Sequence, residues 1–221
     1  MPSSKKRISL VGTSFEEEAR AAGFRLIAGL DEVGRGALAG PVVAAAVILD
    51  PCAPLPDGLD DSKRLSPAER ERIAEELKRT AIAIGIGEVS AEEIDRINIL
   101  QATRRAMMIA LHRLDPRPDY LLIDGMRLPG SGLAQRAIVG GDAISASIAA
   151  ASVIAKTWRD RLMRECDALY PAYGFASHVG YGTRAHLEAL RIHGPCPLHR
   201  RSFRGVLQED SLGKGSCFAS R

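Results

Sequence analysis

Two apolar runs separated by acids and glycines constrain this chain more than any other feature of its sequence. The runs cover residues 25–30 and 41–49, and Asp31, Glu32, Gly34, Arg35 and Gly36 lie between them. Each run has the length and branched content of a buried strand, and the glycine-rich link predicts a hairpin. A carboxylate pair at the end of a buried strand is costly to desolvate unless the acids face a cleft or hold a metal.

The adjacency of Asp31 and Glu32 limits how they can act together. Successive side chains of a strand point to opposite faces, so both acids can serve one site only where the pleat breaks down. We expect Gly34 and Gly36 to supply that break, and their lack of a side chain lets a polymer backbone approach closely. An acid pair beside glycines is also common in a surface turn without chemistry, and this segment alone leaves both interpretations open.

A dinucleotide-binding loop is a rival interpretation of the glycines, because Gly-x-Gly after a strand is typical of such loops. That fingerprint should open a helix at once. Here Pro41 leads into an apolar run that ends at Asp50, which indicates a second strand instead. The hairpin is therefore favoured.

Length and composition set the broad class of the protein. With 221 residues and 46% hydrophobic content, the chain can bury a sizeable core and suggests one domain with an appended C-terminal segment. No segment has the pattern of a transmembrane helix or a secretory signal, so we expect a cytoplasmic location.

Charge gives only a weak indication of the partner. The net charge of +3 is too small to require a polyanion by itself. Basic residues cluster at 62–64, 159–161 and 199–204, and they would follow phosphates if several of them converged on the acids. The alternative for each cluster is a solvated helix face or tail.

Periodicity and capping signals predict the remaining elements. Three consecutive strands followed by helices alternating with two more strands predict an α/β sheet with antiparallel and parallel parts. The small residues of the alanine-rich helix would let it lie close to the sheet. The expected elements after the hairpin are a helix from Pro67 capped by Ser66, a strand within 80–89, a short helix after Ser90, a helix over 99–114, strands ending near Asp124 and Asp142, the alanine-rich helix over 143–164, and a helix over 183–193.

Acids recur at three predicted strand ends. Asp31 with Glu32, Asp124 and Asp142 would meet if the first strand lay beside the two later ones. Four converging carboxylates suit hard divalent cations, and such sites commonly use two metals to activate water and neutralise a phosphodiester transition state. Each acid alone is more often a turn residue, but the repeated placement favours a metal site.

A histidine and cysteine pattern near the C-terminus raises the alternative of a zinc site. His193, Cys196 and His199 lie within seven residues of one another, but zinc needs about four ligands and no fourth is close in sequence. We expect a basic loop there instead.

Taken together, these segments closely resemble the bacterial ribonuclease HII family, the type 2 ribonucleases H. The resemblance extends from about Arg25 to Phe203 and follows the family's motif order. The matching motifs include GLDEVGRG at 29–36, DSKRL at 61–65, LIDG at 122–125, SIAAASVIAK at 147–156, GYGT at 180–183 and HRRSF at 199–203.

The resemblance implies a ribonuclease H-like fold, a mixed five-stranded sheet flanked by helices with a helical C-terminal segment. It divides the chain into an N-terminal extension over 1–24, a catalytic domain over 25–204 and a polar tail over 205–221. The implied activity is that of an endonuclease that hydrolyses the RNA strand of RNA–DNA hybrids. The resemblance further implies cutting 5′ of single ribonucleotides embedded in duplex DNA, by a two-metal reaction that leaves 3′-hydroxyl and 5′-phosphate ends.

Particular residues inherit roles from the resemblance. The family's catalytic and metal-binding acids, which hold Mn²⁺ or Mg²⁺, fall on Asp31, Glu32, Asp124 and Asp142. Telling RNA from DNA requires recognition of a 2′-hydroxyl, and in this family a glycine-rich turn and a tyrosine perform it at the RNA to DNA junction. Those positions are Gly34, Arg35, Gly36 and Tyr181 here, and the implied phosphate contacts are Lys63, Lys156 and Arg200.

Alternatives stay open for some of these assignments. Tyr181 could instead be a packed core aromatic. The sister family, ribonuclease HIII, typically carries a separate N-terminal nucleic-acid-binding domain, for which residues 1–24 are too short. A binding module without catalysis is disfavoured, because buried acids without a metal would be a liability. We expect a monomer that binds RNA–DNA hybrid and ribonucleotide-containing duplex DNA and no membrane, and protein partners such as a sliding clamp stay undetermined.

Overall fold

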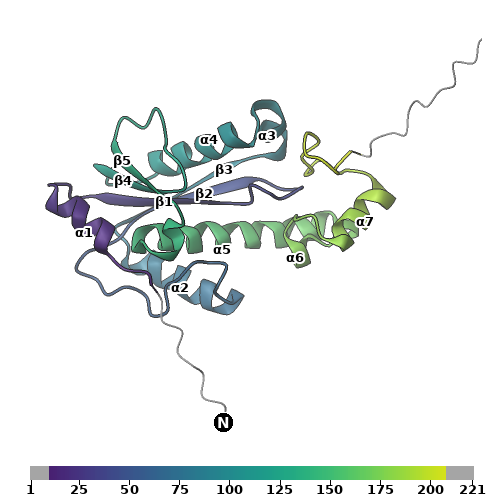
Figure 1. Ribbon diagram of the computed structural model, residues 1–221. Coiled ribbons are helices and arrows are strands. Elements are labelled where there is room, and N and C mark those ends of the chain that lie inside the picture. Colours follow the sequence, from purple (N-terminus) through teal and green to yellow (C-terminus); the bar gives the residue numbers. More distant parts are fainter. Residues whose placement is uncertain (1–9, 208–221) are drawn as a thin grey trace, which may run out of the picture.

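A mixed sheet of five strands forms the centre of the molecule, as the sequence predicts (Figure 1). The computed structural model describes residues 10–207 of the chain. The strand order across the sheet is β3-β2-β1-β4-β5. The strands are β1 (Ile27–Val33), β2 (Val42–Ile48), β3 (Ala83–Val89), β4 (Tyr120–Asp124) and β5 (Ala134–Ile138).

The central position of β1 decides where the acids lie. Strands β1, β2 and β3 pair antiparallel in chain order, whereas β4 pairs parallel with β1 and β5 pairs parallel with β4. The first strand therefore lies beside β4, with β5 on the far side of β4, and this order brings the three acid-bearing segments to one part of the sheet. Parallel pairing puts the C-terminal ends of β1 and β4, where Asp31 and Asp124 occur, at one edge of the sheet.

The helices begin near the predicted capping residues. Ser66 and Glu69 form a reciprocal capping box at the start of α2, and the side chains of Ser90 and Thr183 cap α3 and α7. The helices are α1 (Ser14–Ala21), α2 (Pro67–Thr80), α3 (Ala91–Ile97), α4 (Ile99–His112), α5 (Ala146–Leu169), α6 (Phe175–His178) and α7 (Arg184–His193), with 3₁₀ turns η1 (Gly141–Ala143) and η2 (Pro171–Tyr173).

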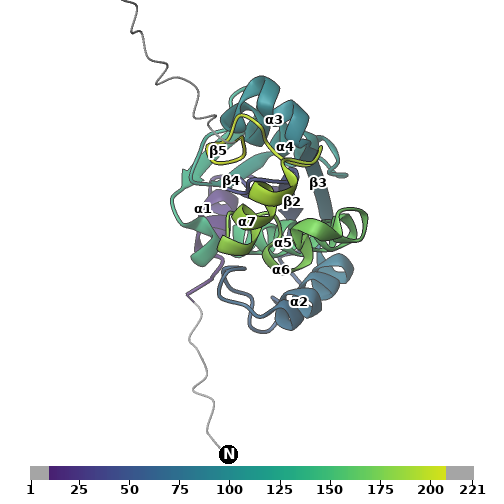
Figure 2. The same cartoon turned by 90° about the vertical axis from the view of Figure 1, so that its right-hand side faces the viewer.

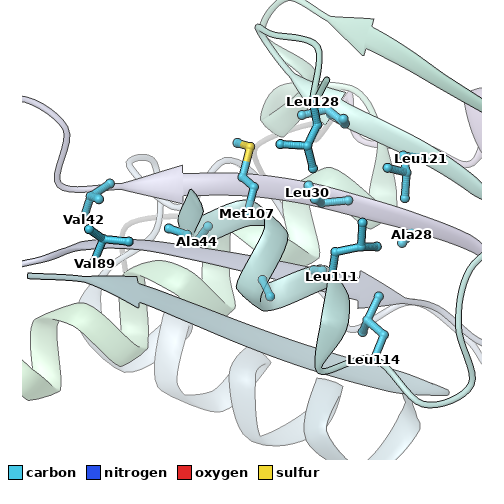
Figure 3. Close-up of a cluster of buried hydrophobic side chains, with 14 of the residues drawn as sticks. Ala28, Leu30, Val42, Ala44, Val89, Met107, Leu111, Leu114, Leu121 and Leu128 are labelled. Carbon is cyan, nitrogen blue, oxygen red and sulfur yellow. The ribbon is translucent and has the colours of Figure 1, made fainter. Parts of the chain in front are cut away.

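Helices cover both faces of the sheet, and α6 and α7 lie beyond one end of it (Figures 1 and 2). On one face, Met107 and Leu111 of α4 pack onto Leu30 and Leu121 of the central strands (Figure 3). On the other face, α5 and α2 share a second core cluster with β2. No helix within residues 10–207 is long and apolar enough to cross a membrane.

Helix α5 lies unusually close to β1, which confirms the expectation drawn from its small residues. A Cβ atom added at Gly29 would overlap the backbone of Ser147 on α5. The neighbouring positions of α5, from Ala149 to Ala151, are alanines with no exposed surface. Because β1 has no side chain at this point, the strand and helix backbones come into direct contact.

The N-terminal segment differs from the expected extension over 1–24. Residues 14–21 form α1, and the carboxylate of Glu16, which is 2% exposed, accepts hydrogen bonds from Ser145 Oγ and from the amide and hydroxyl of Ser147. These groups belong to the start of α5, so α1 completes the N-terminal end of that helix. Residues 1–9, and 208–221 of the expected polar tail, lie outside the described residues.

Substitution of Gly29 tests the contact between α5 and β1. We expect Gly29→Ala to lower the free energy of unfolding by about 1–3 kcal/mol or more, because the helix must move away from the sheet to accept a methyl group. Chemical denaturation measures this difference. Gly12→Ala is the control, because a Cβ atom there meets nothing within 4 Å, and equal small losses for both variants would contradict the close contact.

Candidate active site

Asp31 and Glu32 are the fifth and sixth residues of β1, and the pleat continues through both of them. Asp31 pairs with Ala45, Glu32 with Ala44 and Val33 with Val43 in an unbroken ladder with β2. The pleat therefore runs through both acids and breaks only after Val33, at the predicted glycine, where Gly34 has φ +87°. Asp31 lies on the α5 side of the sheet and Glu32 on the opposite side. The two carboxylates are therefore not on one face, but the charge of Asp124 acts on both of them.

Asp31 is the most deeply held acid of the group, with 5% of its surface exposed. Its Oδ1 accepts the Glu32 amide at 2.7 Å, and the Ser152 hydroxyl of α5 hydrogen-bonds to its carboxylate. Ser152 is in turn 2.8 Å from the hydroxyl of Ser62. Burial raises the pKa of Asp31 well above its ordinary value, the charges of Glu32 and Asp124 raise it further, and the Ser152 hydrogen bond partly offsets them.

Asp124 and Asp142 come from different elements. Asp124 is the last residue of β4, and its Oδ1 accepts the Gly141 amide at 2.7 Å. Asp142, predicted near a strand end, lies in η1, four residues beyond the last residue of β5 and just before α5. Burial and the charge of Asp142 raise the pKa of Asp124. The two acids are neighbours because Gly141, whose amide binds Asp124, directly precedes Asp142 in the chain.

Glu32 offers an oxygen with no protein partner. Its Oε1 accepts from Arg35 Nη1 at 3.1 Å, whereas its buried Oε2 has no hydrogen bond. Burial raises the pKa of Glu32, the hydrogen bond and charge of Arg35 lower it, and the charge of Asp124 raises it. An unpaired buried carboxylate oxygen is costly, and a cation would satisfy it.

Lys63 brings a positive charge to the acids. Its Nζ lies 2.8 Å from Asp142 Oδ2 and 3.7 Å from Asp61 Oδ1, with 74% of the side chain exposed. Burial alone would lower the pKa of Lys63, but the hydrogen bond and charge of Asp142 raise it above the ordinary value. The lysine therefore stays charged, and it is accessible to solvent while it pairs with Asp142.

The donor chemistry fits a hard divalent cation, although the side chains do not form a closed cage. Within residues 10–207, no three His, Cys, Asp or Glu side chains are arranged as a metal site. Two of the four acids instead form ion pairs, Glu32 with Arg35 and Asp142 with Lys63. Four neighbouring carboxylates, raised pKa values at three of them and the unpartnered oxygen of Glu32 nevertheless match what Mg²⁺ or Mn²⁺ prefers.

The glycine-rich turn follows β1 directly and is shaped by its glycines. Gly34 has φ +87°, and a Cβ atom there would overlap the side chain of Arg159. Arg35 and Gly36 are exposed beside the acids. The turn thus presents backbone and one arginine to the outside.

Tyr181 lies next to this turn and is not a core residue. Its side chain is half-buried, with the ring centre 5.6 Å from the guanidinium of Arg159. The preceding carbonyl, of Gly180, accepts the amides of Leu38 (2.8 Å) and Ala39 (3.2 Å). These bonds join the Tyr181 loop to the segment that follows the glycine-rich turn.

The two remaining predicted cations differ in their surroundings. Lys156 lies one turn beyond Ser152 on α5, pairs with Asp160 at 2.8 Å and lines a cavity that also contains Arg70 and Arg164. Arg200 is fully buried and donates to the carbonyls of Gly40 and Arg35. The expected phosphate contact of Arg200 is therefore wrong, because its guanidinium supports the turn from inside.

The groups that hold the site residues in place were not among those predicted from the sequence. Ser152 orients Asp31, and the buried Arg159 donates to the carbonyls of Ala39, Pro41 and Val179. Ser62 lies inside a motif singled out by sequence, but its partner is 90 residues away. Such long-range pairs leave no local pattern.

Comparison with known proteins relates most of the chain to one family. Residues 28–206 match the family model described as Ribonuclease HII. A ribonuclease HII of Geobacillus kaustophilus is 59% identical over 87% of this chain and 73% of its own length. That of Geobacter sulfurreducens is 54% identical over 92% of both chains.

Solved structures show the same fold. Ribonuclease H2 from Pyrococcus horikoshii matches with a TM-score of 0.71 and 28% identity, covering 82% of this chain and 95% of its own. The ribonuclease HII of Archaeoglobus fulgidus, solved in complex with PCNA, matches with a TM-score of 0.69 and 26% identity, covering 85% of this chain and 98% of its own. A ribonuclease HIII solved with Mn²⁺ matches with a TM-score of 0.62 and 20% identity, covering 85% of this chain and 70% of its own. The fold is therefore ribonuclease H-like.

Removal of one buried charge tests the electrostatics of the site. In the presence of a chelator at pH 7.5, we expect Asp31→Asn to raise the melting temperature. The rise should be roughly 2–4 °C for each kcal/mol gained in the free energy of unfolding when the buried charge is removed. The raised pKa of Asp31 means that its ionisation destabilises the folded state. This cost begins as the pH rises above about 4 and is complete above the folded-state pKa, so the gain should vanish in acid.

The exposed Asp57 supplies the control, because Asp57→Asn removes no buried charge. Calorimetry of the parent and both variants from pH 4 to 8 measures the effect. A gain for Asp31→Asn that does not depend on pH, or no gain at pH 7.5, would show that repulsion at Asp31 is not the cause.

Proposed function

Because the chain belongs to the ribonuclease HII family and is therefore a ribonuclease that hydrolyses the RNA strand of RNA–DNA hybrids, we propose that it also cuts duplex DNA 5′ of a single embedded ribonucleotide. The observation that carries this proposal is the pair of hydrogen bonds from Leu38 and Ala39 to Gly180. They hold the Tyr181 loop against the turn that follows Glu32, next to the acids. The cut leaves 3′-hydroxyl and 5′-phosphate ends.

Four carboxylates carry the chemistry in this proposal. Asp31, Glu32, Asp124 and Asp142 would hold two divalent ions, Mn²⁺ or Mg²⁺. When bound, such ions would activate water and neutralise charge on the phosphodiester. The Ser152 hydroxyl and the Glu32 amide fix the orientation of the Asp31 carboxylate, and the Gly141 amide fixes that of Asp124.

Recognition of the sugar is assigned to the groups beside the acids. Backbone groups of Gly34, Arg35 and Gly36, with the hydroxyl of Tyr181, contact the 2′-hydroxyl at the RNA to DNA junction, since that group alone distinguishes a ribonucleotide. The exposed Lys63 contacts a phosphate near the acids, and Lys156 contacts one farther along α5. The catalytic unit extends over residues 25–204, and α1 completes it from outside that range.

Replacement of single acids tests the catalytic set. We expect Asp31→Asn, Asp124→Asn and Asp142→Asn each to reduce cleavage by orders of magnitude, because the loss of one ligand charge weakens metal binding and water activation. The assay uses a labelled duplex with one ribonucleotide, with and without Mn²⁺ or Mg²⁺.

Asp57→Asn serves again as the surface control and should cleave like the parent. Circular dichroism should show all four variants folded. Parental turnover by any one of the three acid variants would remove that acid from the site, and cleavage in chelator would refute metal dependence.

Tyr181 supplies the test of junction recognition. We expect Tyr181→Ala to lose most cleavage at a lone ribonucleotide while Tyr181→Phe keeps part of it, because the ring remains and only the hydroxyl is lost. The melting temperature should change little, since truncation of a buried core aromatic would cost about 3–5 kcal/mol and this side chain is only partly buried. The role fails if folded Tyr181→Ala cuts at the parental rate, or if the variant is strongly destabilised.

A further inference from the structure

Three buried histidines lie directly behind the Tyr181 loop. His178 ends α6, His186 lies in the first turn of α7, and His199 follows that helix; their exposed fractions are 8%, 0% and 2%. The rings of His178 and His186 stack with centres 4.4 Å apart and planes 14° apart. Neither the acid site nor the predicted substrate contacts account for this cluster.

The hydrogen bonds determine which nitrogen of each ring carries the proton. The Cys196 amide donates to His199 Nδ1 at 3.0 Å, so the His199 proton is on Nε2. That Nε2 lies 3.0 Å from Nε2 of His186, which must accept. The proton of His186 is then on Nδ1, where it donates to the Tyr181 carbonyl at 2.9 Å. For each neutral ring, only one tautomer satisfies this whole series of hydrogen bonds.

His178 holds the neighbouring peptide group. The Gly180 amide donates to His178 Nδ1 at 3.2 Å, and His178 Nε2 donates to the Tyr173 carbonyl at 2.8 Å. The two stacked rings therefore bind the N–H of Gly180 and the C=O of Tyr181. The carbonyl of Gly180 is the group that bonds to the segment after the glycine-rich turn.

The loop held by these histidines contains a residue, Val179, in an unfavourable backbone conformation. Val179 has φ 44° and ψ 37°, a left-handed conformation that β-branched residues rarely adopt and that costs about 1–3 kcal/mol. It persists because Val179 donates to the Phe175 carbonyl and accepts from Arg159 Nη1. Such strain is kept only where surrounding contacts determine the conformation.

The cluster is built to stay uncharged. Burial and the neighbouring His186 lower the pKa of His199 to about 4, and burial lowers the pKa of His186. Protonation of either ring would oppose two N–H groups at 3.0 Å. Around the cluster, the structure places Tyr173 and Phe175 rings and the Cys196 thiol, with His193 against Tyr173, and the Arg200 guanidinium comes from the residue after His199.

We propose that His186 and His199 are positioning residues for Tyr181, a two-ring hydrogen-bond relay that fixes the Tyr181 carbonyl and so sets the ring against the junction sugar. The inference rests on the proposed role of Tyr181. It assigns a task to the buried pair beyond packing, because the relay ends on the one residue of this loop that would contact substrate.

Two isosteric changes at His186 separate this task from packing. Asparagine places its amide near the position of Nδ1, so His186→Asn can keep the bond to Tyr181 and lose the one to His199. Glutamine places its amide near the position of Nε2, so His186→Gln can keep the hydrogen bond to His199 and loses the one to the Tyr181 carbonyl. Both changes remove the imidazole, and asparagine, one methylene shorter than glutamine, fills less of the buried space, so packing alone would make His186→Asn the more damaging change.

We expect His186→Gln to lower kcat/KM at a lone ribonucleotide about tenfold to a hundredfold, and to affect a continuous RNA–DNA hybrid less. His186→Asn should stay within about threefold of the parent on both substrates. Equal losses by both variants on both substrates, in proportion to their melting temperatures, would overturn the positioning role and leave only packing.

A measurement on the parent protein covers the case in which the variants do not fold. Long-range ¹H–¹⁵N correlation spectra at pH 7 should show three neutral rings, His186 protonated at Nδ1 and His178 and His199 at Nε2. A protonated Nδ1 on His199, or a cationic His186, would refute the relay. Parental cleavage by Tyr181→Ala would instead refute junction recognition, while the spectra still decide on the relay itself.

Discussion

The contact between α5 and β1 at Gly29 is the constraint on which the active site depends. Because the helix backbone at Ser147 rests on Gly29, Ser152, five residues farther along α5, reaches Asp31, two residues farther along the same face of β1. Asp142 lies in the 3₁₀ turn just before this helix. One close contact therefore sets the burial of Asp31, its serine partner and the approach of a second acid.

Two buried arginines extend the same constraint to the substrate side. Arg159 of α5 donates to carbonyls of the segment after the glycine-rich turn and to the Val179 carbonyl, just before the Tyr181 loop. Arg200 donates to the carbonyls of Arg35 and Gly40. Backbone carbonyls accept all of these bonds, so the contacts do not depend on other side chains. The acids, the glycine-rich turn and Tyr181 are thereby held as one unit.

Sequence predicted what local patterns encode. The hairpin, the capped helices and the strand-end placement of Asp31 and Asp124 follow from periodicity and turn chemistry, and the structure contains them. The phosphate contact of Arg200 was wrong, because the burial of this arginine depends on the carbonyls of Gly40 and Arg35, far away in the chain. The docking of α1 through Glu16, whose partners lie about 130 residues away, escaped prediction for the same reason.

Anomalous diffraction from crystals of the parent protein soaked in Mn²⁺ tests most directly the proposal that the four carboxylates at one edge of the sheet form a metal centre. We expect manganese peaks coordinated by oxygens of Asp31, Glu32, Asp124 and Asp142, with none in crystals of Asp124→Asn soaked at the same concentration. Peaks confined to other parts of the molecule, at a concentration that supports cleavage, would contradict it.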